Sequence, residues 1–240
     1  METRKNQCPG RAKYLAGKRI LPQPISKEST ITSLIDNLDA YNGGRLRAAC
    51  QLMKEKYSHP DVTIGLSLAG ALTPAGMGPS TVVPLMNHGF VDWISATGAN
   101  MYHDLHYAFN LPMHRGSHNV DDADLRNKGI TRIYDILFDY EDVLMETDRR
   151  LRKILLRPEF QKEMGTREFY HLLGKVLNDC EAENHLGQVS ILAAAYRNGI
   201  PVFTSSPGDS THGMNVAGLE LLARASGLTH KFKLKINPSI

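Results

Sequence analysis

Long apolar runs are missing from this chain of 240 residues. No stretch approaches the roughly 18 consecutive apolar residues that a membrane-spanning helix requires, and no apolar core follows the basic residues near the start as it would in a signal peptide. Cysteine is scarce: the three residues have no paired spacing, which favours reduced thiols and a cytoplasmic protein. A net charge of only +3 is too small to indicate a nucleic-acid partner.

Sequence motifs that would identify a catalysed reaction are absent as well. The chain has no strict Gly-x-Gly-x-x-Gly, no His-Glu-x-x-His and no visible Ser-His-Asp set. His103 and His106, with His114 and His118 nearby, leave a metal-dependent hydrolase open as an alternative. A structural or substrate-facing role is favoured over a metal site, because helical positions three apart share only part of one face.

What the chain has instead is an alternation of apolar strands and helices. Strands are predicted at 62–68, 90–95, 200–204 and 231–236, and helices at 32–41, 46–57, 79–89, 101–109, 133–156, 166–177, 188–198 and 216–225. This alternation predicts an α/β fold with a doubly wound, mostly parallel sheet and helices on both of its faces.

The remaining segments set the predicted boundaries. Residues 1–30 lack sustained periodicity and are interpreted as an irregular basic arm that precedes one domain at 31–240. The pair Gly43-Gly44 is predicted to separate the first two helices. Residues 110–124 are polar and are expected to form an irregular loop. The last strand, 231–236, is expected at an open edge of the parallel sheet.

Two loops of small residues follow the first two predicted strands. They are Leu68 to Gly76 and Ala96 to Asn100, each rich in Gly, Ala and Thr. Such loops let a backbone approach a ligand closely and offer free N–H groups that suit phosphate. Because the carboxyl ends of parallel strands meet at one sheet edge, the loops predict a nucleotide crevice; an ordinary strand-to-helix turn stays open as the alternative.

A third loop, Ser205 to Asn215, follows the strand at 200–204. Its Asp209 would lie near the carboxyl end of the sheet, where open α/β sheets bind ligands. A carboxylate there can accept ribose hydroxyls or hold a cationic amine. An Asx turn before a helix explains the same residue equally well.

Five short segments occur together in a recognisable order and spacing between Val62 and Gly213. They are Thr63-Ile64 with the loop to Gly76, Val91-Asp92 leading into Thr97-Gly98, Asp104-Leu105, Leu125-Arg126 with Gly129-Ile130 and Arg132-Ile133, and Ile200 to Phe203 leading to Asp209 and Gly213. With these segments the chain resembles the deoxyhypusine synthase family, and more closely the bacterial deoxyhypusine synthase-like proteins.

The resemblance implies a Rossmann-like fold that binds NAD and assembles as a homotetramer with sites between paired subunits. It implies a reaction that begins with hydride transfer from spermidine to NAD. An aminobutyl group then passes through an enzyme lysine to a lysine of the hypusine-containing translation factor. In the bacterial relatives the resemblance implies small amines as acceptors.

The resemblance also implies site residues. Along NAD it places Gly70, Ala71, Leu72, Thr73, Pro74, Thr97, Gly98, Ala99 and Asp209. His103 falls where the eukaryotic enzymes have a glutamate that touches cofactor and amine, and Tyr102 falls on the glutamate before it. Tyr102 and His103 are therefore the expected polyamine contacts. Met214 stands where those enzymes have an anionic amine-binding residue, so a tri-cationic polyamine loses compensating charge.

The family's Trp-Gly-Lys segment with the catalytic lysine has no counterpart here, since the single tryptophan is Trp93. The chain is therefore expected to lack the carboxy-terminal part of the family, and no catalytic residue is assigned. The main hypothesis is an NAD-dependent aminoalkyl transferase that is inactive alone. The alternative is a non-catalytic partner of a full-length paralogue, or an inactive fragment.

Overall fold

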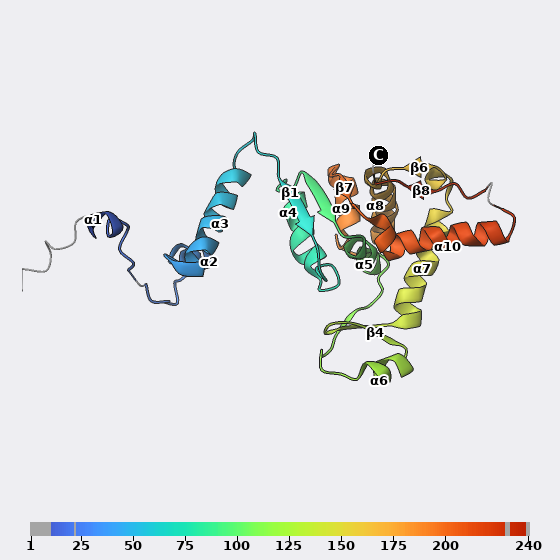
Figure 1. Cartoon of the computed structure of the whole chain (residues 1–240), viewed down its shortest axis with the longest axis horizontal. Helices are drawn as coiled ribbons and strands as arrows, with labels where there is room; N and C mark the ends of the chain where they lie inside the picture. Colours follow the sequence, from blue (N-terminus) through green and yellow to red (C-terminus); the bar gives the residue numbers. More distant parts are fainter. Residues whose placement is uncertain (1–10, 22, 229–230, 239–240) are drawn as a thin grey trace, which may run out of the picture. The chain divides into compact units, whose positions relative to one another are not determined.

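The computed structural model describes residues 11–21, 23–228 and 231–238 (Figure 1). The chain divides into two compact units, Met1–Val62 and Thr63–Ile240, and each is described by itself.

In the described part of the first unit, the helices are α1 (Arg11–Tyr14), α2 (Ile31–Asp36) and α3 (Tyr41–Tyr57). A capping box starts α2, in which Thr30 Oγ1 accepts from the Ser33 backbone N–H. The predicted break at Gly43-Gly44 is wrong, because α3 runs through both glycines. A Cβ on Gly44 would lie 3.2 Å from the Asp39 carbonyl, so the glycines serve close packing in the first turn. Neither α2 nor α3 contains a buried residue.

The main sheet of the second unit has three parallel strands in the order β1 (Gly65–Leu68), β2 (Trp93–Ala96) and β7 (Val202–Phe203). These match three of the predicted strands, and the α/β class with a parallel sheet is confirmed. Gly65 pairs with Trp93, and a Cβ on Gly65 would lie 2.2 Å from the indole ring. The glycine thus makes room for the ring of Trp93 across β1.

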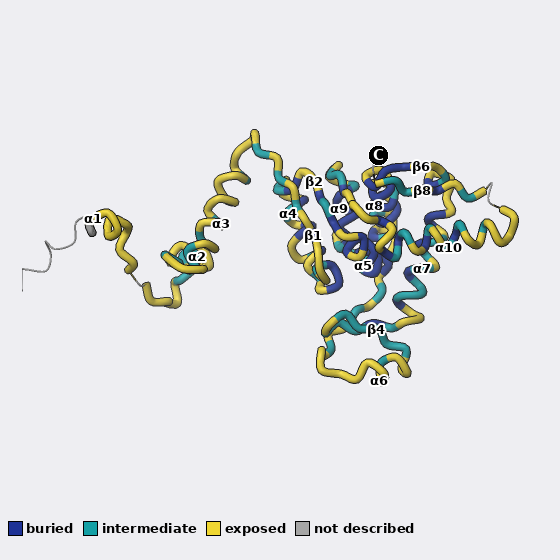
Figure 2. Tube along the Cα trace, viewed as in Figure 1, coloured by how far each residue is buried: buried dark blue, intermediate teal, exposed yellow. Residues whose placement is uncertain are grey.

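Helices surround this sheet and supply most of the core. The chain passes through η1 (Gly78–Val82) and α4 (Val83–Asn87) between β1 and β2, and through α5 (Gly98–Ala108) after β2. The long α8 (Thr166–Glu183) packs against α9 (Ile191–Asn198), where a Cβ on Gly174 would lie 2.3 Å from the Leu192 carbonyl oxygen. The dark blue, buried segments of Figure 2 concentrate in α5, α8 and α9.

Residues 110–139 differ from the prediction. They form an antiparallel sheet of β3 (His114–Arg115), β5 (Ile136–Asp139) and β4 (Ile130–Ile133), with α6 (Asp122–Asn127) before β4. The predicted helix at 133–156 is therefore wrong in its first part. The chain turns helical only at η2 (Tyr140–Met145), which leads into α7 (Glu146–Leu155).

The last strand also differs in its partner. β8 (Lys235–Ile236) pairs in parallel with β6 (Glu163–Met164), in a separate two-stranded sheet, and not at the edge of the main sheet. Two 3₁₀ turns, η3 (Pro158–Phe160) and η4 (Pro207–Asp209), precede β6 and α10. α10 (Thr211–Ala225) starts five residues before the predicted position of 216. Within the described residues, no helix is both long and apolar enough to cross a membrane.

Candidate functional site

A cavity of about 390 Å³ opens at the carboxyl ends of all three strands of the main sheet. It is lined by residues 67–69 after β1, residues 95–99 after β2, and residues 204–206 with Asp209 after β7. The three loops singled out in the sequence therefore meet at one place. Of the predicted cofactor contacts, the structure brings Thr97, Gly98, Ala99 and Asp209 together.

The start of α5 forms one wall of this cavity. Thr97 is the N-cap residue, with extended backbone, and its hydroxyl accepts from the Asn100 N–H. The first N–H groups of a helix have no partner inside it and carry the positive end of the helix dipole. Gly98 and Ala99 contribute two such groups at the cavity, an arrangement suited to a phosphate or another anion.

Asn100 holds the two small-residue loops together. Its side chain is 1% exposed. Oδ1 accepts from the backbone N–H of Thr73 at 3.1 Å and from its hydroxyl at 2.9 Å, while Nδ2 donates to the Gly70 carbonyl at 3.0 Å and to Thr97 Oγ1 at 2.8 Å. One buried amide thereby fixes the loop after β1 against the first turn of α5.

Asp209 belongs to η4 and is exposed at the cavity. One of its carboxylate oxygens accepts from the Ser206 hydroxyl. This bond differs from the Asx turn of the alternative interpretation, in which the carboxylate would accept a following backbone N–H. Asp209 lines the cavity together with Gly98, and its contact with a ligand stays a prediction.

The rest of the first loop lies elsewhere. Gly70 is exposed and has a φ of +67°, a conformation that favours glycine, and Ala71 is exposed beside it. Leu72 is half-buried, whereas Thr73 and Pro74 are buried, and the Pro74 carbonyl accepts from the Tyr107 hydroxyl at 3.2 Å. None of these five predicted contacts, Gly70 to Pro74, lines the cavity of this chain.

Tyr102 and His103 lie on α5, away from the cavity lining. Tyr102 is 1% exposed, and its hydroxyl donates to Asp148 Oδ1 at 2.8 Å. Burial and the neighbouring carboxylate raise the pKa of Tyr102, so it stays a neutral donor. His103 Nδ1 lies 3.0 Å from His106 Nε2, and His106 Nδ1 lies 2.8 Å from Thr147 Oγ1.

Burial keeps these histidines neutral. It lowers the pKa of His103 to about 4 and that of His106 to about 3. His114 and His118 are exposed and belong to the segment 110–139. In the part of the chain that the structure describes, no three His, Cys, Asp or Glu side chains are grouped to hold a metal. The metal-dependent hydrolase therefore has no geometric basis there.

A polar network that the sequence reasoning missed connects α5, α7 and α10. Asn215 Nδ2 donates to Asp148 Oδ1 at 2.8 Å, and Arg152 Nε donates to Asn215 Oδ1 at 2.6 Å. Beside it, His212 is fully buried between the rings of Tyr102, Phe169 and Tyr170.

His212 is paired at only one of its ring nitrogens. Its Nδ1 lies 3.4 Å from the Tyr170 hydroxyl, and its Nε2 has no hydrogen-bond partner among the described residues. Burial lowers the pKa of His212 to about 3. The residue follows Asp209 by three positions, but nothing in its sequence context signals burial.

In the sequence, Asp104 belongs to Asp104-Leu105, one of the five segments that carry the resemblance. In the structure, its carboxylate has a structural role. It is fully buried and accepts from the Ser190 hydroxyl at 2.6 Å and from the N–H groups of Ile191 at 2.8 Å and Leu192 at 2.9 Å. The carboxylate thus caps the start of α9. Desolvation raises its pKa to about 6.

Comparison with known proteins gives a consistent result. The family model described as deoxyhypusine synthase matches residues 31–234. A deoxyhypusine synthase-like protein of Nostoc sp. is 50% identical over 211 residues, which cover 88% of this chain and 55% of that protein. One from Cyanothece sp. is 50% identical over 208 residues, covering 86% of this chain and 52% of that protein. The chain therefore spans about half the length of these curated relatives.

A solved structure supports the fold. A crystal structure from Entamoeba histolytica, assigned to deoxyhypusine synthase, superposes with a TM-score of 0.56 at 16% identity, covering 88% of this chain and 68% of that one. At this identity the likeness concerns the fold alone.

Proposed function

Because this chain belongs to the deoxyhypusine synthase family, we propose that the cavity at the carboxyl ends of β1, β2 and β7 is an NAD site. On this proposal the fold is a Rossmann-like, doubly wound one. The chain contributes to a transferase that moves an aminobutyl group from spermidine or a related polyamine to an amine acceptor, either a protein lysine or a small amine.

The observation that carries the proposal is the convergence of three loops on one cavity. The N–H groups of Gly98 and Ala99 suit the diphosphate, and Asp209 suits the ribose hydroxyls. Thr97 caps the helix that presents the two N–H groups, and Asn100 fixes its position. NAD, when bound, supplies the acceptor for the hydride.

The other proposed NAD contacts lie outside the lining of the cavity. Gly70 to Pro74 and His103 are proposed to contact the same cofactor, although they do not line the cavity of a single chain. Of the two proposed polyamine contacts, Tyr102 is buried and bound to Asp148, which leaves His103 with exposed surface.

A polyamine needs negative charge that these residues do not supply. His103 is neutral, and Met214 is uncharged and 61% exposed. A desolvated ammonium group requires a carboxylate partner. We therefore propose that the amine is held by carboxylates outside this cavity, supplied in a cytoplasmic homo-oligomer, a tetramer as in the family, or by a full-length paralogue.

Titration with NAD, followed by calorimetry, tests the binding proposal. We expect saturable binding to the full chain, and a Kd about tenfold higher for Asp209→Asn, since a hydrogen bond to a charged group contributes about 1.5 kcal/mol or more. Asp142→Asn removes an exposed carboxylate from η2, outside the cavity, and should bind like the unaltered chain. Absence of binding at millimolar NAD contradicts the proposal.

The second candidate is a non-catalytic partner of a complete family member. It is favoured by the lack of a carboxylate at Tyr102, His103 and Met214, where a bound amine would need one. Spermidine-dependent reduction of NAD should be measured for the chain alone, for a full-length relative, and for their mixture. Turnover by the chain alone refutes this candidate, whereas turnover that rises only in the mixture supports it.

A further inference from the structure

A run of three hydrogen bonds joins η2, α7 and α5. Thr147 Oγ1 donates to the Val143 carbonyl at 2.7 Å. His106 Nδ1 lies 2.8 Å from Thr147 Oγ1, and His103 Nδ1 lies 3.0 Å from His106 Nε2. We call these four linked residues, Val143, Thr147, His106 and His103, the histidine relay. Thr147 and His106 are fully buried, so solvent does not compete for the bonds between them.

The direction of these bonds follows from the number of protons on each group. A hydroxyl has one proton, and that of Thr147 goes to the Val143 carbonyl, which can only accept. His106 Nδ1 must therefore carry a proton and donate to Thr147. Because burial lowers the pKa of His106 and keeps its ring neutral, its Nε2 has no proton and accepts from His103 Nδ1. Burial lowers the pKa of His103 as well, and the neutral ring then has no proton on its own Nε2.

The Nε2 atom of His103 is the open end of the histidine relay. Among the described residues, His212 Nε2 is the only side-chain nitrogen or oxygen that is both unpartnered and sealed from solvent. His103 is half-buried, and its unpartnered Nε2 is therefore accessible. His103 follows Ala99, which lines the proposed NAD site, by four positions on α5. Residues four apart are neighbours on one helix face, about 5–6 Å from each other, so a ligand that extends from the cavity along α5 reaches this nitrogen.

We propose that Thr147 and His106 are positioning residues, which hold His103 in the tautomer whose Nε2 accepts a hydrogen bond from an N–H group of the ligand. The inference deepens the proposed function and rests on it. Two groups of the proposed ligands offer such a donor, the carboxamide of the nicotinamide ring and an amine of the polyamine. A neutral acceptor suits an amide or an uncharged amine, because it supplies no charge to balance a desolvated ammonium group.

Nitrogen NMR of the full chain, labelled with ¹⁵N-histidine, tests the tautomer without any ligand. Bare and protonated ring nitrogens resonate in separate ranges. We expect a protonated Nδ1 and a bare Nε2 for His103, assigned by the loss of their signals in His103→Gln.

Substitution of Thr147 tests the positioning role. Thr147→Val removes the acceptor of the His106 proton, and an unpaired buried N–H is costly. The proton should move to His106 Nε2, which reverses the histidine relay and puts a proton on His103 Nε2. Thr147→Ser keeps the hydroxyl and should keep the original tautomer. Thr147→Ala removes the same hydroxyl if valine does not fit.

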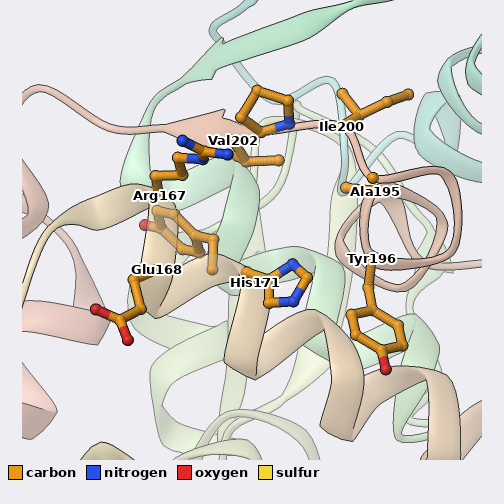
Figure 3. Close-up of a pocket in the computed structure, with 10 residues that line it drawn as sticks. Arg167, Glu168, His171, Ala195, Tyr196, Ile200 and Val202 are labelled. Atoms are coloured by element: carbon orange, nitrogen blue, oxygen red, sulfur yellow. The ribbon is translucent and has the colours of Figure 1, made fainter.

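His171 is the matched control histidine. It lies on α8 and lines a separate cavity of about 360 Å³, which shares no lining residue with the proposed NAD site. Figure 3 shows its ring facing the space between α8 and α9, and its centroid lies 5.1 Å from that of Tyr196. Its signals should not respond to Thr147→Val. A protonated Nε2 on His103 in the unaltered chain, or a bare one in Thr147→Val, overturns the proposal.

Titrations with NAD alone, with spermidine alone and with both identify the donor. A hydrogen bond from a ligand moves the signal of a bare nitrogen toward the protonated range. A shift with NAD alone assigns the donor to the carboxamide, and a shift that requires spermidine assigns it to an amine. The ligand that shifts the signal should bind about tenfold more weakly to Thr147→Val than to Thr147→Ser.

No shift of His103 Nε2 in any of the three titrations overturns the proposed contact. Calorimetry on the same samples separates this failure from failure of the NAD site. NAD that binds without a shift counts against His103 alone, whereas NAD that does not bind counts against the site itself.

Discussion

Gly98 and Ser210 approach each other so closely that a Cβ on Gly98 would lie 2.4 Å from both the Cβ and the Oγ of Ser210. The first turn of α5 and the loop before α10 are in contact at this point. The contact brings Asp209, the neighbour of Ser210, to the helix start that carries Gly98. The glycine that suggested a nucleotide loop in the sequence is therefore required by packing as well.

Gly98→Ala should destabilise the chain by about 1–3 kcal/mol, the usual effect of overpacking, and should weaken NAD binding. Urea unfolding and NAD titration measure the two effects. Ser210→Gly removes both clashing atoms, so the double variant should recover most of the loss. Gly218→Ala is the matched control, because a Cβ there meets nothing within 4 Å, and we expect it to be neutral or slightly stabilising. Equal losses for Gly98→Ala and Gly218→Ala contradict the packing argument.

Asn100→Ala removes the amide that joins the two loops. The Gly70 carbonyl and the Thr73 N–H lose their partner, and we expect a loss of about 2 kcal/mol together with weaker NAD binding. The control is Asn119→Ala, an exposed residue whose backbone N–H, and not its side chain, bonds to Ser117. If Asn100→Ala unfolds at the same urea concentration as the control, the amide does not stabilise the loops.

Asp104→Asn tests the cap of α9. An amide NH₂ cannot accept, so at least one of the groups that now donate to Asp104 loses its acceptor. We expect a loss of about 2 kcal/mol at pH 7, where the carboxylate is charged, measured by thermal or urea unfolding. Asp179→Asn, exposed on α8, should leave stability within about 0.5 kcal/mol of the unaltered chain. If Asp104→Asn leaves the free energy of unfolding unchanged, the carboxylate of Asp104 does not stabilise the start of α9.

Acid should destabilise the chain partly through His212. The pKa of His212 is about 3 in the folded chain and 6.5 by reference, so below pH 6.5 the unfolded chain binds a proton that the folded chain does not. Stability from this group is present above pH 6.5 and falls as the pH drops. Between pH 7 and pH 5 this group lowers the free energy of unfolding by about 2 kcal/mol, which is about 1.36 kcal/mol for each pH unit below 6.5.

His212→Phe removes that titration and keeps an aromatic ring among Tyr102, Phe169 and Tyr170. Urea unfolding measures how far the free energy of unfolding decreases between pH 7 and pH 5. This decrease should be about 2 kcal/mol smaller in the variant than in the unaltered chain. The contribution of Asp104 to the pH dependence of stability has the opposite sign, because burial raises its pKa to about 6. Asp104 is present in both proteins, so its contribution cancels in the comparison. An identical pH dependence would falsify the assignment to His212; His212→Leu provides a second variant if phenylalanine does not fit.

The main sheet could be predicted because its strands are short apolar runs followed by small residues. β1, β2 and β7 are each followed by a loop that the sequence marked, and parallel strands bring such loops together. The meeting of Thr97 to Ala99 with Asp209 therefore follows from local pattern and topology. The role of Asn100 does not, because its four partners depend on how the two loops pack.

The antiparallel sheet of residues 114–139 could not be predicted for a different reason. Its β4–β5 hairpin turns at Tyr134 and Asp135, where the usual Asn-Gly or Asp-Gly signal is missing. Tyr134 has a φ of +55°, a region that an aromatic residue rarely enters. Without a turn signal, the apolar residues of β5 run into those of η2 and α7 and imitate one long helix.

Trp93 is the chain's only tryptophan, and its ring lies against Gly65 on the neighbouring strand. With 40% of its surface exposed, it senses solvent on one side and β1 on the other. The chain therefore carries a single tryptophan fluorophore across the β1–β2 pair, and β2 leads directly into the cavity. Its emission reports separation of these two strands without any added label.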